Sequence, residues 1–390
     1  MMYLTEKCPT SILYSPYKPI FDLFTFPCGA KIRKRLVMAP MTTWSSNEDG
    51  SISNQEIDYY RLRARNVGML ITAAAHVLPV GQGFPRQLGA HCDDKIPSLK
   101  NLITTIQIQC ASGVLQIFHA GRMRSPDILP MMQPVSASSI PAEHEGAVAP
   151  HEMTEYEILD TIEAFGEATH RAMKAGFNGV EIHGANGFLI QQFFSPHTNR
   201  RTDKWGGSLE KRMAFPLAVV DEVKEVIADY ATWRFIVGYR LSPEEVWNQG
   251  ITMDDTLQLV DALAKKKLDY LHVSTPDFWG GSLRDENDKK PRAVLIHERV
   301  GDRIPIIGVG SIRTPDDVVK VMDTGIPLVA LGRELIMEPY WLEKLKEREE
   351  HKIRTTLSVT AREKDRDEFD IPDGLWQVIM ERKGWLPVVE

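Results

Sequence analysis

The sequence is poor in cysteine and has no excess of positive charge. Only four cysteines occur in 390 residues, Cys8, Cys28, Cys92 and Cys110, and none forms a C-x-x-C pair. This argues against a zinc ribbon or an iron–sulfur cluster, so we expect no metal site and a reduced, cytoplasmic protein. The 46 Lys and Arg residues against 53 Asp and Glu give a net charge of −7. A nucleic acid or an anionic membrane is therefore not the expected partner.

Long hydrophobic runs are also missing. No stretch approaches 18 consecutive apolar residues, so we expect no membrane span. Lys7 and Pro9 interrupt the first 20 residues, so we expect no signal peptide. A hydrophobic fraction of 43% and a charged fraction of 25% exclude a disordered or fibrous chain. The length suits two medium domains or one large barrel with additions.

Eight short apolar runs alternate with amphipathic helical segments from about residue 35 onward. Such runs are typical of parallel strands that are buried on both faces. We expect these strands at residues 36–38, 69–74, 114–118, 179–183, 235–240, 270–274, 304–308 and 327–331. Between these strands, Thr154 and Glu157 predict a capping box at the start of a helix, and Gly176 predicts the end of that helix. Thr314 followed by Pro315 predicts the start of another helix.

A strand followed by a helix, eight times over roughly 300 residues, predicts an α/β protein with a single (β/α)8 TIM barrel. We expect residues 1–345 to form this barrel with its N-terminal lead-in, and residues 346–390 to form a C-terminal extension. A doubly wound sheet is the alternative, but no G-x-G-x-x-G follows the first strand. Trp376 and Trp385 indicate that the extension packs against something.

The active site of such a barrel lies at the C-terminal ends of its strands. Gly310 and Gly332 follow the seventh and eighth strands, and a helix starts directly after Thr314. Glycine loops and helix N-termini present backbone N–H groups that bind phosphate, and Arg333 adds a positive charge. We therefore expect a phosphate site there; the alternative is that these glycines only form tight turns.

Polar side chains follow other strands. His183 and Asn186 stand three residues apart after the fourth strand, and both can donate hydrogen bonds toward one point above the barrel mouth. Two such donors suit a developing oxyanion or enolate. Gln116 and Arg240 are expected to point into the top of the barrel, which indicates a polar ligand. The alternatives are a histidine that caps a strand end and an arginine that pairs with Glu181.

Several other enzyme classes lack their motifs here. The sequence has no nucleophile elbow, no P-loop and no zinc motif. None of the predicted strand ends carries the lysine that a Schiff-base aldolase would need.

The segment 179–208, GVEIHGANGFLIQQFFSPHTNRRTDKWGGS, resembles the signature of the old yellow enzymes almost throughout. These are FMN-dependent NAD(P)H:flavin oxidoreductases and ene-reductases. Shorter matches at 38–42 (MAPMT), 116–122 (QIFHAGR) and 331–335 (LGREL) support the resemblance by their order and spacing. It covers about residues 20–345.

The resemblance implies a set of cofactor and substrate residues. FMN would be held by Pro40, Met41, Thr42, Ala74, Gln116, Arg240, Gly310, Gly332 and Arg333. Thr42 would lie near the N5/O4 edge of the flavin and influence its redox potential. Arg240 would lie by the N1/O2 side and stabilise the reduced anion. His183 and Asn186 would bind the carbonyl oxygen of the substrate and, with Thr42, form the catalytic set.

The activity that this implies is ping-pong hydride transfer from NADH or NADPH through FMN to an electron-poor acceptor, such as an α,β-unsaturated carbonyl. One position departs from the pattern, because Phe188 stands where many relatives have a tyrosine that delivers a proton. Proton delivery contributes on the order of 10²–10⁴-fold, so we predict weak or altered ene-reductase activity. The alternatives are an FMN-binding barrel without efficient turnover and an NADH oxidase that uses O₂.

Two features have open interpretations. Trp44, Trp205, Phe278 and Trp279 either shape the substrate pocket or pack under loops. The segment 382–385 either reaches the site of a neighbouring subunit in a homo-oligomer, as in some relatives, or packs on its own barrel.

Overall fold

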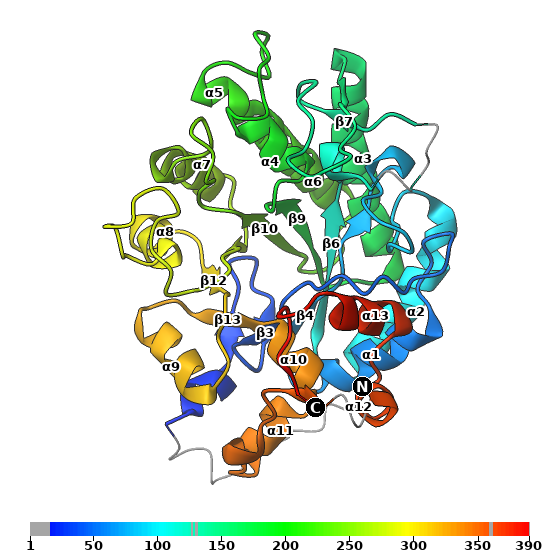
Figure 1. Ribbon diagram of the computed structural model, residues 1–390, viewed down its shortest axis with the longest axis vertical. Helices are drawn as coiled ribbons and strands as arrows, with labels where there is room; N and C mark the ends of the chain where they lie inside the picture. The colour runs from blue at the N-terminus through cyan, green and yellow to red at the C-terminus, as the bar shows by residue number, and fades with distance from the viewer. Residues whose placement is uncertain (1–15, 126–127, 129–131, 359–361, 390) are drawn as a thin grey trace.

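The computed structural model describes residues 16–125, 128, 132–358 and 362–389. Cys8 and most of the segment considered for a signal peptide lie outside the described residues. Among the described helices, none is long and apolar enough to cross a membrane. Within these ranges the chain forms a closed parallel barrel surrounded by helices, as the sequence predicts (Figure 1).

Eight strands form the barrel, and each lies parallel to its neighbours. They are β3 (Leu36–Met38), β4 (Met69–Ile71), β6 (Ser112–Phe118), β9 (Gly179–Gly184), β10 (Ile236–Leu241), β11 (Tyr270–Val273), β12 (Ile306–Gly308) and β13 (Leu328–Leu331). Pairing of β13 with β3 and of β4 with β6 closes the ring. All eight strands match their predicted positions to within three residues. The second is shorter than predicted, and the separate β5 (Ala75–His76) continues its pairing with β6.

Helices surround the barrel, and α3 and α9 start at the residues that the sequence indicates. The helices that return the chain between strands are α1 (Asn54–Ala64), α2 (Ile96–Ile108), α3 (Glu155–Ala175), α6 (Ala214–Tyr230), α7 (Met253–Lys265), α8 (Arg292–Val300) and α9 (Pro315–Asp323), and α10 (Arg333–Met337) follows the last strand. Thr154 and Glu157 form the predicted capping box at α3, and Gly176 ends that helix with a φ of 99°. Thr314 caps α9 in the same way.

Alternate residues of most barrel strands face two separate apolar layers. One layer lies between strands and helices and includes Leu36, Leu70 and Val329. The other fills the barrel interior, and its members are Phe26, Ile32, Val37, Ala39, Met69, Ile71, Val114, Ile236, Tyr270, Ile307, Leu328 and Ala330. Two of these, Phe26 and Ile32, come from the N-terminal hairpin. The interior is therefore a packed core, and a ligand has to bind at its open end.

Smaller elements complete the described chain. The short strands are β1 (Phe24–Thr25), β2 (Lys31–Ile32), β7 (Val135–Ser136), β8 (His151–Glu152), β14 (Leu357–Ser358) and β15 (Val388–Val389). The added helices are α4 (Leu189–Phe194), α5 (Leu209–Arg212), α11 (Trp341–Lys346), α12 (Arg362–Glu368) and α13 (Asp373–Glu381), with single 3₁₀ turns at Lys18–Phe21, Pro79–Gly81, Asp93–Lys95, Gly121–Met123 and Glu350–Lys352.

The C-terminal helix α13 packs beside α1 (Figure 1). Gln55 of α1 donates to the Asp373 carboxylate at 2.8 Å and accepts the Asp373 backbone N–H at 3.1 Å. Trp376 and Trp385 are partly buried against the main core. The extension therefore packs on the barrel of its own chain.

Candidate active site at the barrel mouth

A buried layer of polar side chains covers the apolar interior. Gln116 of β6 donates through Nε2 to Glu181 Oε1 at 2.7 Å, and the other oxygen of Glu181 lies 3.0 Å from His272 Nδ1. Burial raises the pKa of Glu181, but the neighbouring His272 and Arg240 outweigh it, so this pKa lies below its usual range. Glu181 is thus an ionised carboxylate that orients the Gln116 amide.

Arg240 of β10 is buried in the same layer and is only partly satisfied. Its terminal Nη2 donates to Ser274 Oγ at 3.0 Å, whereas Nε has no partner within the described residues. Arg240 and Glu181 form no direct ion pair: the Glu181 oxygens contact Gln116 and His272, and the Arg240 charge acts on Glu181 only over a longer distance. A buried guanidinium N–H without a partner is a group that a bound polar ligand would satisfy.

His183 is the penultimate residue of β9 and Asn186 follows the strand, and the two side chains are neutral donors. Ala185 N–H donates to His183 Nδ1 at 3.2 Å, so the proton of the neutral imidazole is on Nε2. Burial and, secondarily, the charge of Arg240 lower the pKa of His183 to about 3, so the ring is neutral at pH 7. The Asn186 Oδ1 accepts from Ser274 Oγ at 2.9 Å, which leaves its NH₂ group free to donate.

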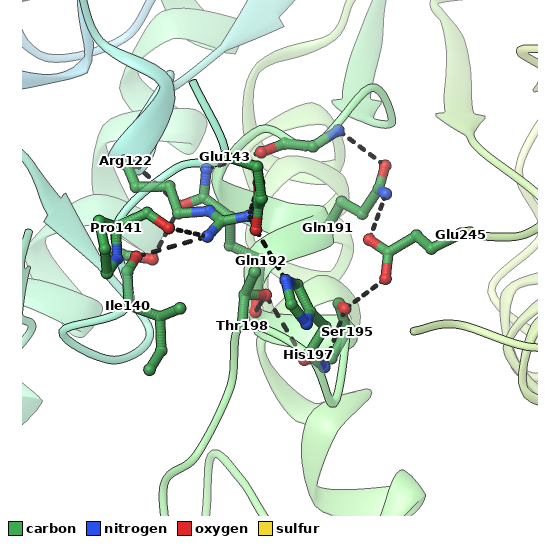
Figure 2. Close-up of polar contacts among 12 residues, drawn as sticks. Arg122, Ile140, Pro141, Glu143, Gln191, Gln192, Ser195, His197, Thr198 and Glu245 are labelled. Atoms are coloured by element: carbon green, nitrogen blue, oxygen red, sulfur yellow. Dashed lines mark hydrogen bonds and ion pairs between the residues drawn. The ribbon is translucent and has the colours of Figure 1, made fainter. Parts of the chain in front are cut away.

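The turn that carries Asn186 is held by two adjacent glutamines of α4. Gly187 N–H donates to Gln191 Oε1 at 3.0 Å, and Gln192 Nε2 donates to the Gly187 carbonyl at 2.7 Å. Gln191 is itself fixed, because its Nε2 donates to Glu245 Oε1 at 2.7 Å (Figure 2). The peptide groups before and after Gly187 are therefore both held by hydrogen bonds, which fixes the positions of Asn186 and Phe188.

A second polar group fixes the rim nearby. Arg122, which follows β6, donates twice to the Glu143 carboxylate at 2.8 Å, and His197 Nε2 lies 2.7 Å from the same carboxylate (Figure 2). Burial raises the pKa of Glu143, but the hydrogen bonds from Arg122 and His197 lower it by more. The pKa of Glu143 therefore lies below its usual value. These contacts tie the loop around Glu143 to the end of β6 and to the segment after α4.

Phe188 faces an apolar wall. Its ring packs edge-on against Phe118 at 4.4 Å and against His183 at 5.0 Å between centroids. Ala74, a predicted flavin contact, belongs to the same small cluster with Phe118. Its carbonyl accepts from Gln87 Nε2 at 2.9 Å. The wall provides contact area but no proton donor at this position.

The aromatic residues with open interpretations divide into two groups. Trp205 is 6% exposed and donates to Glu155, and Phe278 is fully buried, so both pack in the core. Trp279 is 44% exposed. Trp44 contacts Trp385 of the extension at 6.3 Å between ring centroids.

The predicted phosphate residues lie on adjoining loops. Gly310 and Ser311 have consecutive positive φ angles of 130° and 48°, and the first of these is a conformation that glycine adopts readily. Ser311 Oγ accepts from Arg333 Nη2 at 3.0 Å, which joins the seventh and eighth loops. A Cβ on Gly332 would lie 2.8 Å from Met41 Sδ, so this glycine lets the eighth loop approach the segment after β3. Pro40, Met41 and Thr42 of that segment are half-buried.

Glu334 lies directly after this loop. It is 5% exposed, its Oε2 has no partner in the described chain, and Arg313 Nε is 3.9 Å away. Burial raises the pKa of Glu334 to about 7 despite the two nearby arginines. This carboxyl group is therefore partly protonated near neutral pH.

The structure also shows functional neighbours that sequence reasoning missed. Ser274 was visible as a strand end, but nothing in the sequence said which side chains it would touch. The same holds for Glu181 and His272, whose pairing depends on the strand register. Gln191 and Gln192 lie inside the long motif, yet only the fold places them against Gly187. The described residues contain no cluster of three or more His, Cys, Asp or Glu side chains that could hold a metal.

Comparison with known proteins decides the family. The model of the NADH:flavin oxidoreductase / NADH oxidase family matches residues 19–352. The chain belongs to this family. A relative named "Probable NADH-dependent flavin oxidoreductase YqiG" from Bacillus subtilis (strain 168) is 48% identical over 95% of this chain and 98% of its own length.

Other family members are larger or structurally known. NADH:acrylate oxidoreductase of Vibrio harveyi is 41% identical over 92% of this chain, but the match spans only 36% of that protein. Morphinone reductase superposes with a TM-score of 0.71 at 28% identity, covering 85% of this chain and 91% of its own. The old yellow enzyme homologue of Zymomonas mobilis has the same fold, with a TM-score of 0.73 over 84% of this chain and 92% of its own.

As a member of this family the chain is an FMN-dependent oxidoreductase that takes its electrons from NADH or NADPH. The mouth fits such a cofactor. Arg240 Nε is a buried donor without a partner among the described residues, and a polar ligand such as the flavin ring would satisfy it.

Proposed function

We propose that this protein transfers hydride from NAD(P)H through FMN to a small electron-poor acceptor that carries a carbonyl group, such as an α,β-unsaturated carbonyl compound. One observation carries this proposal. His183 and Asn186 present two neutral hydrogen-bond donors at the end of one strand, directly beside the buried Arg240. Two fixed donors stabilise negative charge that develops on a carbonyl oxygen, and they do so without reorganisation.

The residues of the mouth would divide the work. Bound FMN supplies the hydride chemistry. Gln116, held by Glu181, would hydrogen-bond the flavin ring together with Ala74, and Arg240 would stabilise negative charge on it. Pro40, Met41 and Thr42 would line the flavin, and the Gly310, Gly332 and Arg333 backbone would hold its phosphate. His183 and Asn186 would align the acceptor, and the neutral imidazole would stay neutral over the working pH range because its pKa lies near 3.

A second function, hydride delivery to an acceptor that needs no proton from the protein, is favoured by Phe188. The phenyl ring lies among Phe118, Ala74 and His183 and offers no acidic hydrogen. O₂ is one such acceptor. The acrylate and fumarate oxidoreductases support another reading, because the region that matches this chain is only 36% and 38% of those proteins. In that arrangement the barrel would oxidise NADH and another protein unit would reduce the final acceptor.

The first experiment is anaerobic titration of the purified yellow protein with NADH and, separately, with NADPH. Bleaching of the flavin absorbance supports the oxidoreductase, and the ratio of the two bleaching rates identifies the reductant. A yellow protein that neither nucleotide bleaches would support an FMN-binding barrel without turnover. Re-oxidation by 2-cyclohexenone, by acrylate or by air with measured peroxide then separates the acceptors.

Phe188→Tyr tests the missing proton donor. If water protonates the substrate slowly, the new hydroxyl should raise 2-cyclohexenone reduction by at least about tenfold, the low end of general-acid effects. Phe118→Tyr is the matched control, because it adds a hydroxyl to the neighbouring ring of the same wall. An unchanged rate in Phe188→Tyr, with FMN retained, would show that proton delivery is not limiting.

We also propose the remaining assignments made from the sequence. These are action in the cytoplasm, a barrel unit that ends near residue 345, and self-association as a homo-oligomer. Sedimentation of the holoenzyme tests the last of these. The Trp385–Trp44 contact within one chain supports a tail that completes its own subunit.

A further inference from the structure

Three side chains link the cofactor side of the mouth to the substrate side. Arg240 Nη2 donates to Ser274 Oγ at 3.0 Å, and Ser274 Oγ donates to Asn186 Oδ1 at 2.9 Å. A guanidinium group can only donate hydrogen bonds, and a hydroxyl has one hydrogen to give. Because Ser274 accepts from Arg240, its single hydrogen is directed to Asn186.

This order determines how the Asn186 amide is turned. The oxygen of the amide must face Ser274, so its NH₂ group must face away from Ser274. Ser242 Oγ, which accepts the Asn186 backbone N–H at 2.9 Å, also donates to Oδ1, but at 3.4 Å this hydrogen bond is longer and weaker than the 2.9 Å bond from Ser274. Asn186 also has a φ of 58°, so its backbone is held in an uncommon conformation that places the side chain beside Ser274.

We propose that Ser274 is a positioning residue that fixes the Asn186 amide as a donor toward the acceptor's carbonyl oxygen and links it to Arg240 at the flavin. The proposal rests on the function proposed above. Without the Ser274 hydroxyl, the amide can rotate and present its oxygen to the substrate, which repels a carbonyl oxygen. The loss should appear in ligand affinity and KM, while the amount of bound FMN stays the same.

The test compares holoenzymes of wild type, Ser274→Ala and Ser274→Thr. The probe is 4-hydroxybenzaldehyde, whose phenolate oxygen takes the place of the acceptor's carbonyl oxygen, titrated against the visible absorbance of the oxidised flavin. Ser274→Ala should raise its Kd about fivefold or more, the value of one net hydrogen bond, and should raise the KM for the acceptor more than it lowers kcat. Ser274→Thr keeps the hydroxyl and should retain the wild-type Kd to within about twofold.

Thr275→Val is the matched control. Thr275 is the next residue, and its hydroxyl donates to the Val309 carbonyl at 2.7 Å. Removing that hydroxyl should leave the Kd of the probe unchanged. If Ser274→Ala does not keep its FMN, Ser274→Cys replaces it, because a thiol fills the space of the hydroxyl and is only a weak donor.

The outcomes are distinct. A wild-type Kd in Ser274→Ala, or in Ser274→Cys where it is used, overturns the proposal. The same holds if Ser274→Thr loses as much affinity as Ser274→Ala. His183→Ala is measured in parallel, since it removes the other donor. If His183→Ala binds the probe as wild type does, the carbonyl site itself is wrong and the function proposed above fails. If only Ser274→Ala does so, that function stands and the positioning role fails.

Discussion

Replacing Glu334 by glutamine should make the protein more stable than wild type at alkaline pH. The Glu334 pKa is raised from 4.5 to about 7 in the folded chain, because the carboxyl group is buried and one oxygen has no partner in the described residues. Because the pKa is higher in the folded chain than in the unfolded chain, the protonated carboxyl group favours the folded state. This contribution to the unfolding free energy is fully present below the unfolded pKa, near pH 4.5, and is lost as the pH rises through the folded pKa of about 7. A tenfold change in a protonation equilibrium corresponds to about 1.4 kcal/mol, so the full loss of unfolding free energy is about 3 kcal/mol.

The assay is urea unfolding of the FMN-free protein at pH 5.5 and pH 8.5. Between these values the unfolding free energy of wild type should fall by about 2 kcal/mol relative to Glu334→Gln, since part of the loss has already occurred by pH 5.5. Glu347→Gln is the control, because Glu347 is exposed and its removal should leave the pH dependence of wild type. A difference between wild type and Glu334→Gln that does not vary with pH would refute a protonated, buried Glu334.

Three shorter predictions concern the mouth. Gly310→Ala should weaken FMN binding by at least tenfold in a fluorescence titration. A Cβ at this position would lie 2.6 Å from the Phe278 backbone nitrogen, and the φ of 130° disfavours any side chain. An unchanged affinity for FMN would rule out a glycine-dependent phosphate site. Trp385→Ala should remove the contact with Trp44 and lower the Tm by a few degrees, with no change in molecular mass if the contact is within one chain. The kcat/KM for the acceptor should show no transition near pH 6.5 from His183, whose pKa is lowered to about 3, and a transition there that disappears in His183→Ala would contradict a neutral ring.

The fold was predictable because its signals are local. The apolar runs and the capping boxes at Thr154 and Thr314 depend on residues a few positions apart, and all appear in the structure. The side-chain partners were less predictable, because they depend on register and distance in space. Glu181 could have paired with Arg240, but parallel pairing places it beside Gln116. An aromatic residue in a loop gives no sign of its depth, so buried Trp205 could not be told from a pocket residue.

The way in which the Gly187 turn is held has a consequence for divergence in this family. The glutamines that fix this turn approach it through its backbone and from α4, so they place no chemical demand on the next side chain, Phe188. That ring has neighbours but no hydrogen bond, and a tyrosine or another flat residue can occupy its position while the turn and Asn186 stay in place. The side chain at position 188 can therefore diverge without the loss of any hydrogen bond that holds the turn.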